Sequence, residues 1–193
     1  MAQYYDIDDI MMEEELISVV FQVGANGVGL LDPGSETNNV EQGAKVDLPF
    51  WLAHELCLRQ AVSINIPHCF NQKTRKEIQA DAACVDLRTR CPFFYELGCK
   101  VTPLVGDRSI GSFLLYAFSG RYKEVLSKGH SAAFATAPKF LPLLTREESH
   151  LFEAARSSMA AFKKWRVGGS RLERASVLGR KRKPAGPMQD PTS

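Results

Sequence analysis

The hydrophobic period of the chain changes once, about a third of the way along, and this change constrains the fold more than any other feature. Before it, apolar residues alternate with polar ones, as at Val62, Ile64 and Ile66, which is typical of half-buried strands. After it, apolar residues return every three or four positions, the period of an amphipathic helix. Strands followed by helices predict an α+β fold. We therefore expect a small β-rich domain with short helices at residues 1–66 and a larger all-helical domain at residues 67–166.

Two expected elements of the first part meet without a loop. Residues 44–48 alternate like a strand, and Pro49 then leads directly into an apolar run that contains Trp51 and Leu52. Proline is favoured at the first position of a helix, because it has no N–H to leave unpaired there. We therefore expect Pro49, Trp51 and Leu52 to form a structural hinge that opens a helix over residues 49–59, with Trp51 in the core.

Two long amphipathic segments dominate the second part. Asp107 is expected to cap the first, which continues to Gly129, and "TREE", from Thr145 to Glu148, is a capping box that opens the second. The second ends at Gly168. The two apolar stripes consist of Ile110, Phe113, Leu114, Ala117, Phe118, Tyr122, Val125 and Leu126, and of Leu151, Phe152, Ala155, Met159 and Phe162.

The formal net charge is +2, but the charged residues are distributed unevenly along the chain. Residues 1–60 carry −9, whereas residues 163–193 carry +7. Residues 167–193 are basic and rich in Gly, Pro and Ser, so we expect a disordered tail there. Its unbroken cationic run, Arg180, Lys181, Arg182 and Lys183, is a nuclear-localisation candidate or a nucleic-acid contact, and otherwise a solubilising terminus.

The sequence offers little that indicates catalysis or ligand binding. It contains neither a phosphate-binding loop nor a nucleophile or zinc-protease motif, so we expect no enzyme and no cofactor. The five cysteines are odd in number and lack a CxxC pair, which argues against a disulfide framework and a metal site and favours a reducing compartment. No apolar run approaches the ~20 residues of a membrane helix, so we expect no membrane association.

Three segments of the chain resemble a known family. These are "YYDIDDIMMEEE", "QGAKVDLPFWLAHEL" and "CPFFYELGCKVTPL", and the similarity to the third Psf subunit family of the GINS complex runs from about Tyr4 to Trp165. The resemblance implies a nuclear, non-catalytic structural subunit that forms a heterotetramer with the three other GINS subunits. It implies that this heterotetramer joins the MCM ring and a Cdc-type partner to make the active replicative DNA helicase in initiation and fork progression, with weak or indirect DNA contact.

The resemblance also accounts for the width of the first long stripe. Leu115 and Tyr116 extend it beyond what a lone small domain needs, and sister subunits would cover the excess. The alternative hypothesis is a nucleic-acid-binding module that acts through its basic C-terminal tail. A salt-dependent affinity of the isolated chain for DNA would distinguish the two.

Overall fold

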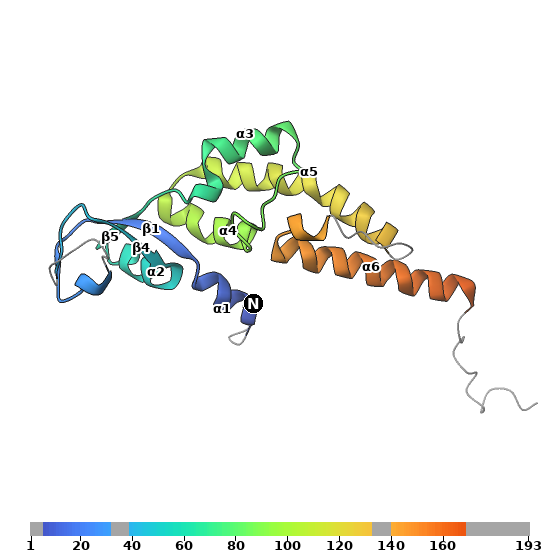
Figure 1. Cartoon of the computed structure of the whole chain (residues 1–193), viewed down its shortest axis with the longest axis horizontal. Helices are drawn as coiled ribbons and strands as arrows, with labels where there is room; N and C mark the ends of the chain where they lie inside the picture. The colour runs from blue at the N-terminus through green and yellow to red at the C-terminus, as the bar shows by residue number, and fades with distance from the viewer. Residues whose placement is uncertain (1–5, 32–38, 133–139, 169–193) are drawn as a thin grey trace, which may run out of the picture.

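The computed structural model describes residues 6–31, 39–132 and 140–168 (Figure 1). Strands precede the main helices along the chain, which confirms the expected α+β class. In chain order the elements are α1 (Ile7–Glu13), β1 (Leu16–Phe21), β2 (Ala25–Asn26), the 3₁₀ turn η1 (Gly29–Leu31), β3 (Asn39–Val40), β4 (Lys45–Pro49), α2 (Phe50–Leu58), β5 (Val62–Ile64), η2 (His68–Phe70), α3 (Gln72–Ala80), α4 (Phe94–Val105), α5 (Arg108–Ala132), η3 (Leu141–Leu143) and α6 (Arg146–Val167).

The main sheet is antiparallel, with strand order β4-β1-β5, while β2 and β3 form a separate pair. Its central strand places Val19 opposite Val46 on one side and Ile64 on the other. All three side chains are buried, because residues at matched positions of neighbouring strands face the same side of a sheet. Ile66, which the alternation placed inward, is 44% exposed, because β5 ends at Ile64 and no longer holds it to the sheet.

The strand passes into the helix at Pro49, as expected. The helix itself begins one residue later than predicted. Pro49 pairs with Leu16 as the last residue of β4 and serves as N-cap, so α2 begins at Phe50. The expectation that Trp51 belongs to the core is wrong, because its side chain is 46% exposed. Phe50 and Ala53, three residues apart, occupy the buried face instead, and successive residues of a helix point 100° apart. Leu52 is half-buried and packs against the core.

The helical part is organised around α5. The α4–α5 hairpin turns at Gly106, whose positive φ of 73° suits glycine, and Asp107 caps α5 by accepting a hydrogen bond from the Ser109 N–H at 2.8 Å. The C-terminal half of α5 packs along α6 (Figure 1). Gly129 does not end α5, which continues to Ala132, and α6 lies close to it: a Cβ at Gly129 would stand 2.8 Å from the Ala155 Cβ.

Helix α6 begins and ends as its sequence predicts. The Glu148 N–H donates to the Thr145 hydroxyl and the Thr145 N–H donates to the Glu148 carboxylate, so the capping box is complete. Gly168 closes the helix with a φ of 84°. The basic run from Arg180 to Lys183 lies outside the described residues.

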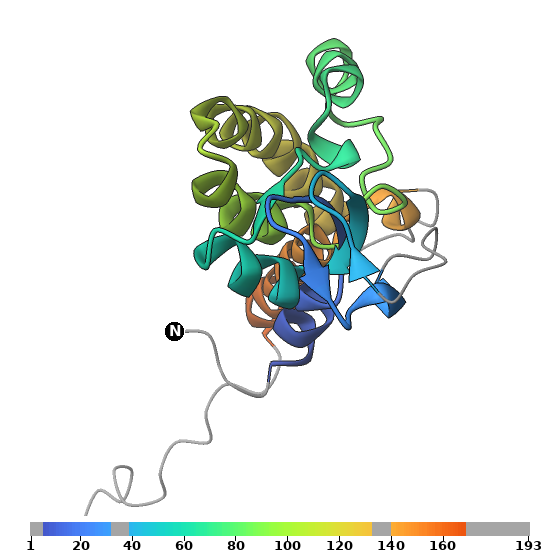
Figure 2. The same cartoon turned by 90° about the vertical axis from the view of Figure 1, so that its left-hand side faces the viewer.

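The strand region and the helices share a continuous buried core. One cluster of buried side chains extends from Ile17 and Val19 of β1 to Phe94 of α4 and Ile110 of α5. Figure 2, in which the strand region faces the viewer, shows the strands in front of the helices. A second, smaller cluster between α5 and α6 consists of Val125, Phe140, Leu144 and Phe152. The two parts of the chain are therefore packed on one another.

Candidate subunit interface

An apolar groove of about 820 Å³ runs along the α4–α5 hairpin. Both helices contribute to its walls, because the turn at Gly106 lays them side by side. Its apolar lining consists of Tyr95, Cys99 and Pro103 from α4 and of Leu114, Leu115 and Phe118 from α5, and two charged residues, Arg108 and Glu147, also line it. Sequence periodicity could not indicate this groove, since it arises from two helices in contact.

Helix α5 is apolar on more than the face that meets the core. Ile110 and Ala117 are fully buried, whereas Leu115 is 68% exposed and Phe118 is 41% exposed. Tyr122, which the stripe placed inward together with Phe118, is also partly exposed. A helix with so wide an apolar surface is typically buried on several sides. Neighbouring exposed apolar side chains mark an interaction surface.

The groove also contains open space and an unpaired acceptor. The nearest atom to a Cβ added at Gly111 is the Thr102 Cγ2 at 4.0 Å, so this position has room for a side chain. At the far end, Glu147 Oε1 accepts hydrogen bonds from the Tyr95 and Glu96 N–H groups at 3.0 and 3.1 Å and thereby caps α4. Glu147 Oε2 is buried and has no partner among the described residues.

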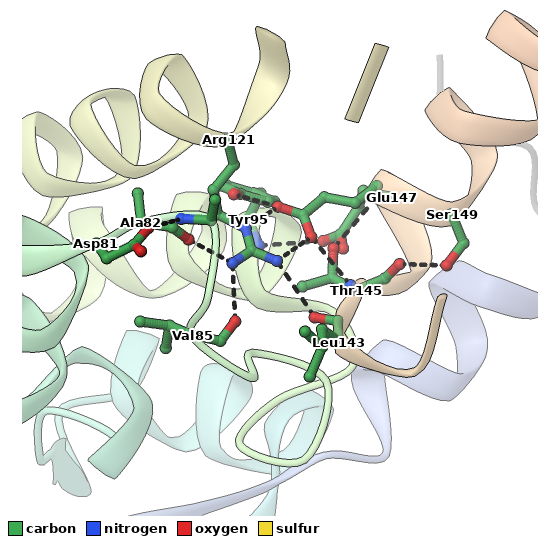
Figure 3. Close-up of polar contacts among 11 residues, drawn as sticks. Asp81, Ala82, Val85, Tyr95, Arg121, Leu143, Thr145, Glu147 and Ser149 are labelled. Atoms are coloured by element: carbon green, nitrogen blue, oxygen red, sulfur yellow. Dashed lines mark hydrogen bonds and ion pairs between the residues drawn. The ribbon is translucent and has the colours of Figure 1, made fainter. Parts of the chain in front are cut away.

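A buried ion pair holds the helices that form the groove (Figure 3). Arg121 Nε donates to Glu148 Oε1 at 2.5 Å and its Nη2 donates to Oε2 at 2.8 Å. The remaining N–H groups of Arg121 donate to the carbonyl oxygens of Ala82, Val85 and Leu143. The guanidinium therefore joins α5 to α6 and to the segments that follow α3 and precede α6.

Tyr95 completes this cluster from α4. Its hydroxyl donates to Glu148 Oε1 at 2.8 Å, and burial together with the Glu148 charge raises the pKa of this hydroxyl. Burial alone would lower the pKa of Arg121, but the hydrogen bond to Glu148 outweighs it and the pKa is raised. Arg121 therefore stays charged at neutral pH. Sequence analysis missed Arg121, although a cation four residues from both Ala117 and Val125 on an apolar stripe is a usable signal.

Of the predicted hinge residues, Trp51 borders a second hollow. Trp51 lines a space of about 490 Å³ with Phe50, His54 and Lys100, next to the groove, and Pro103 lines both. Lys100 forms ion pairs with Asp9 of α1 at 2.6 Å and with Glu13, which attaches α1 to α4. The structure therefore places Trp51 beside the groove and outside the core.

The described part of the chain contains no group of three His, Cys, Asp or Glu side chains that could hold a metal ion. All five cysteines are reduced thiols. None of the helices within residues 6–31, 39–132 and 140–168 is long and apolar enough to cross a bilayer.

Two protein-family models match the chain in succession. The PSF3 N-terminal domain matches residues 5–58, and the GINS complex protein helical bundle domain matches residues 69–167. The chain belongs to the Psf3 family of GINS proteins. The α4–α5 groove of this Psf3-family chain lies within the helical bundle match.

Curated relatives agree with this Psf3 assignment. The DNA replication complex GINS protein PSF3 of Phaeosphaeria nodorum is 29% identical over 86% of this chain and 96% of its own length. The human protein of the same name is 28% identical over 91% of the chain and 85% of its length. A probable DNA replication complex GINS protein PSF3 of Dictyostelium discoideum is 29% identical over 84% of the chain and 61% of its length.

Proposed function

We propose that this Psf3-family chain is a non-catalytic structural subunit of a GINS heterotetramer. In this proposal the heterotetramer joins the MCM ring and a Cdc-type partner in the active replicative helicase, during initiation and fork progression, and the chain contacts DNA weakly or indirectly. The observation that carries the proposal is the apolar groove on α4 and α5, which lies in the segment that matches the GINS helical bundle domain.

The groove suits a helix from a sister subunit. An amphipathic helix buries its apolar side chains in such a groove at positions i, i+3, i+4 and i+7. Covering the exposed parts of Leu115 and Phe118 contributes a fraction of the roughly 1.5–3 kcal/mol that full burial of such a side chain is worth, because both are already partly buried.

Filling the groove tests the proposal. Gly111→Leu adds a side chain where the structure has open space, and leucine favours a helix over glycine, so the chain keeps its fold. The control is Ser112→Leu, which adds the same side chain one position away and outside the lining of the groove. Each variant is co-expressed with the three other GINS subunits, and the tetramer recovered through a tag on one of them is quantified.

We expect wild type and Ser112→Leu to give a 1:1:1:1 complex, and Gly111→Leu to give little. Failure of the wild-type chain to co-purify with any GINS subunit would contradict the proposed function. Equal recovery of the two variants would leave the subunit assignment intact and exclude the groove as its interface.

We also propose that the basic run from Arg180 to Lys183 directs nuclear entry. Four adjacent positive charges fit an acidic receptor groove in an extended conformation. Replacing all four residues by Ala should leave GINS assembly unchanged and lower the nuclear fraction of the singly expressed chain. An unchanged nuclear fraction would refute this assignment.

The two family matches support division of the chain into units at residues 1–66 and 67–166, followed by a tail at residues 167–193. We propose these as the domains of the chain. Limited proteolysis of the assembled complex should cut first after Gly168, and next between the two domains. Early cleavage within α5 would refute the proposed boundaries.

A further inference from the structure

The part of the chain that carries α3, residues 71–90, begins and ends at the same place in the fold. It leaves the core after η2, forms α3 at the edge of the helical part, and returns just before α4 (Figure 1). Phe70 precedes this α3 segment and Phe94 follows it, and their ring centroids are 5.0 Å apart. Arg90, at the return, donates to the Thr74 hydroxyl at 2.6 Å. Contacts between residues near its two ends therefore close the base of the α3 segment.

A buried cysteine lies on each side of this base. Cys69, in η2, is 6% exposed, and Cys91, three residues before α4, is 2% exposed. Both belong to the main core cluster. Both also line one hollow of about 590 Å³, whose other walls come from β1, β4 and the residues after β5. The two cysteines thus lie at the joint between the strand region and the helices.

The two thiols contact one another. The hydrogen bond with Cys69 is the main cause that raises the pKa of Cys91, and burial adds to it. A thiol that is kept protonated in this way is a poor nucleophile. Cys69 is the less deeply buried of the two, so we expect an oxidant that enters the hollow to react first with Cys69. Cys91 is then already in contact with the sulfur that has reacted.

We propose that Cys69 and Cys91 form a reversible disulfide under oxidising conditions and thereby close the α3 segment into a covalent ring. The oxidant in this proposal is glutathione disulfide. The Cys69 sulfur attacks it, which gives a mixed disulfide and releases one glutathione thiol that takes the Cys69 proton. The Cys91 sulfur then attacks the Cys69 sulfur, and the second glutathione leaves with the Cys91 proton. Two protein thiols are oxidised while one disulfide is reduced to two thiols, so atoms and electrons balance.

The ring would stabilise the folded chain. A cross-link restricts the unfolded chain, and the effect grows with the number of residues that the ring encloses. Because the two sulfur atoms already contact each other in the folded chain, we expect this gain to exceed the cost of any distortion. In a reducing compartment both residues stay thiols. The pair would therefore be a redox-sensitive cross-link, and this inference goes beyond the proposed function and does not rest on it.

Peptide mapping tests the link directly. The full chain is incubated with glutathione disulfide or with dithiothreitol, remaining thiols are blocked with N-ethylmaleimide under denaturing conditions, and trypsin digests the product. Trypsin releases Cys69 on the peptide 60–73 and Cys91 on the peptide 91–100. Cys99 lies on the second peptide as well, so Cys99→Ser is the matched control variant, and its thiol is exposed in the structure.

We expect most of the oxidised wild-type chain, and most of oxidised Cys99→Ser, to yield peptides 60–73 and 91–100 joined by a disulfide. Dithiothreitol should abolish this species. Oxidation should raise the melting temperature of both proteins by at least about 5 °C. Cys91→Ala, which leaves a small apolar side chain in the core, should lose both the link and the shift.

Three outcomes would overturn the inference. In the first, Cys69 and Cys91 both still react with N-ethylmaleimide after oxidation. In the second, Cys69 stops at the mixed disulfide with glutathione, which would place Cys91 out of reach. In the third, Cys69 joins Cys99, a link that Cys99→Ser would abolish. Each outcome is read from the wild-type chain in two redox states, so it holds even where Cys91→Ala does not fold, and it does not depend on GINS assembly.

Discussion

At the scale of single residues, Arg121 shows how a charge is accommodated in this core. A guanidinium has five N–H donors, and the structure provides an acceptor for each of them: two carboxylate oxygens of Glu148 and three backbone carbonyls. A buried pair satisfied in this way costs little to keep. It costs much more to break, because the charge that remains is then buried without a partner.

Arg121→Met should therefore be severely destabilising. It leaves the Glu148 carboxylate buried beside Tyr95, and we expect a loss of about 3–5 kcal/mol in the free energy of unfolding. Urea denaturation followed by circular dichroism measures this loss, with Lys123→Met, an exposed position on the same helix, as the control. Arg121→Met/Glu148→Gln removes both charges and keeps the reach of the capping box, so it should recover part of the stability. A double variant as unstable as the single one would argue against an uncompensated charge as the cause.

The start of α2 gives a second prediction at this scale. Phe50 is 3% exposed and Trp51 is 46% exposed, so the two aromatic residues should differ in what they contribute. Phe50→Ala should cost about 3–5 kcal/mol of stability. Trp51→Ala should cost about 1 kcal/mol, because much of its ring already meets solvent. Thermal unfolding of the two variants compares them directly, and a larger loss for Trp51→Ala would mean that its ring is covered in solution.

At the scale of elements, local signals predicted boundaries well. Asp107 and Thr145 cap the helices that their sequences indicated, since a cap depends on a few neighbouring residues. Alternation identified β4 and β5, because one face of the sheet meets the core. Periodicity was less informative about Trp51 and Phe118, because it shows which side of an element is apolar and does not show how much of that side the rest of the chain covers.

The candidate interface could be predicted only in outline for the same reason. The width of the α5 stripe indicated an excess of apolar surface, and Leu115 and Tyr116 are indeed exposed. The groove itself depends on the turn that lays α4 against α5, and the Arg121 cluster depends on carbonyl groups from two separate segments. Contacts of that kind arise from tertiary packing and leave no periodic pattern in the sequence.

Two glycines of α5 should respond in opposite directions to the same substitution. A Cβ at Gly129 would stand 2.8 Å from the Ala155 Cβ and 2.9 Å from the Phe152 carbonyl oxygen, so Gly129→Ala should separate α5 from α6 and cost about 1–3 kcal/mol. At Gly111 the nearest atom is 4.0 Å away, so Gly111→Ala should stabilise the helix by up to about 1 kcal/mol. Melting temperatures measure both effects, and two shifts of the same sign would contradict this account of the α5–α6 contact.

At the scale of the whole molecule, the chain is tied together internally while much apolar surface stays uncovered. Lys100 joins α1 to α4 through Asp9 and Glu13, and these carboxylates raise the pKa of Lys100 although burial opposes its charge. Asp8, which also belongs to α1, lies close to α6: its Oδ2 is 3.3 Å from the Nε2 of His150. The fold is therefore not short of internal contacts. Its exposed apolar residues on α1, α5 and α6 require a different explanation.

The lone chain should consequently associate with itself or aggregate. Ile7, Leu115, Trp165 and Val167 are each more than two-thirds exposed, and they lie on three different helices. Water contact with so many separated apolar side chains favours association, which removes that surface from solvent. We expect concentration-dependent self-association in analytical ultracentrifugation at micromolar concentration, and a single 1:1:1:1 species when the three other GINS subunits are co-expressed. Partner binding should also raise the apparent melting temperature, because a ligand of the folded state stabilises it by mass action. A lone chain that stays monomeric over the full concentration range and unfolds cooperatively would mean that these side chains are tolerated in solvent. The apolar faces of α5 and α6 would then no longer support an obligate assembly.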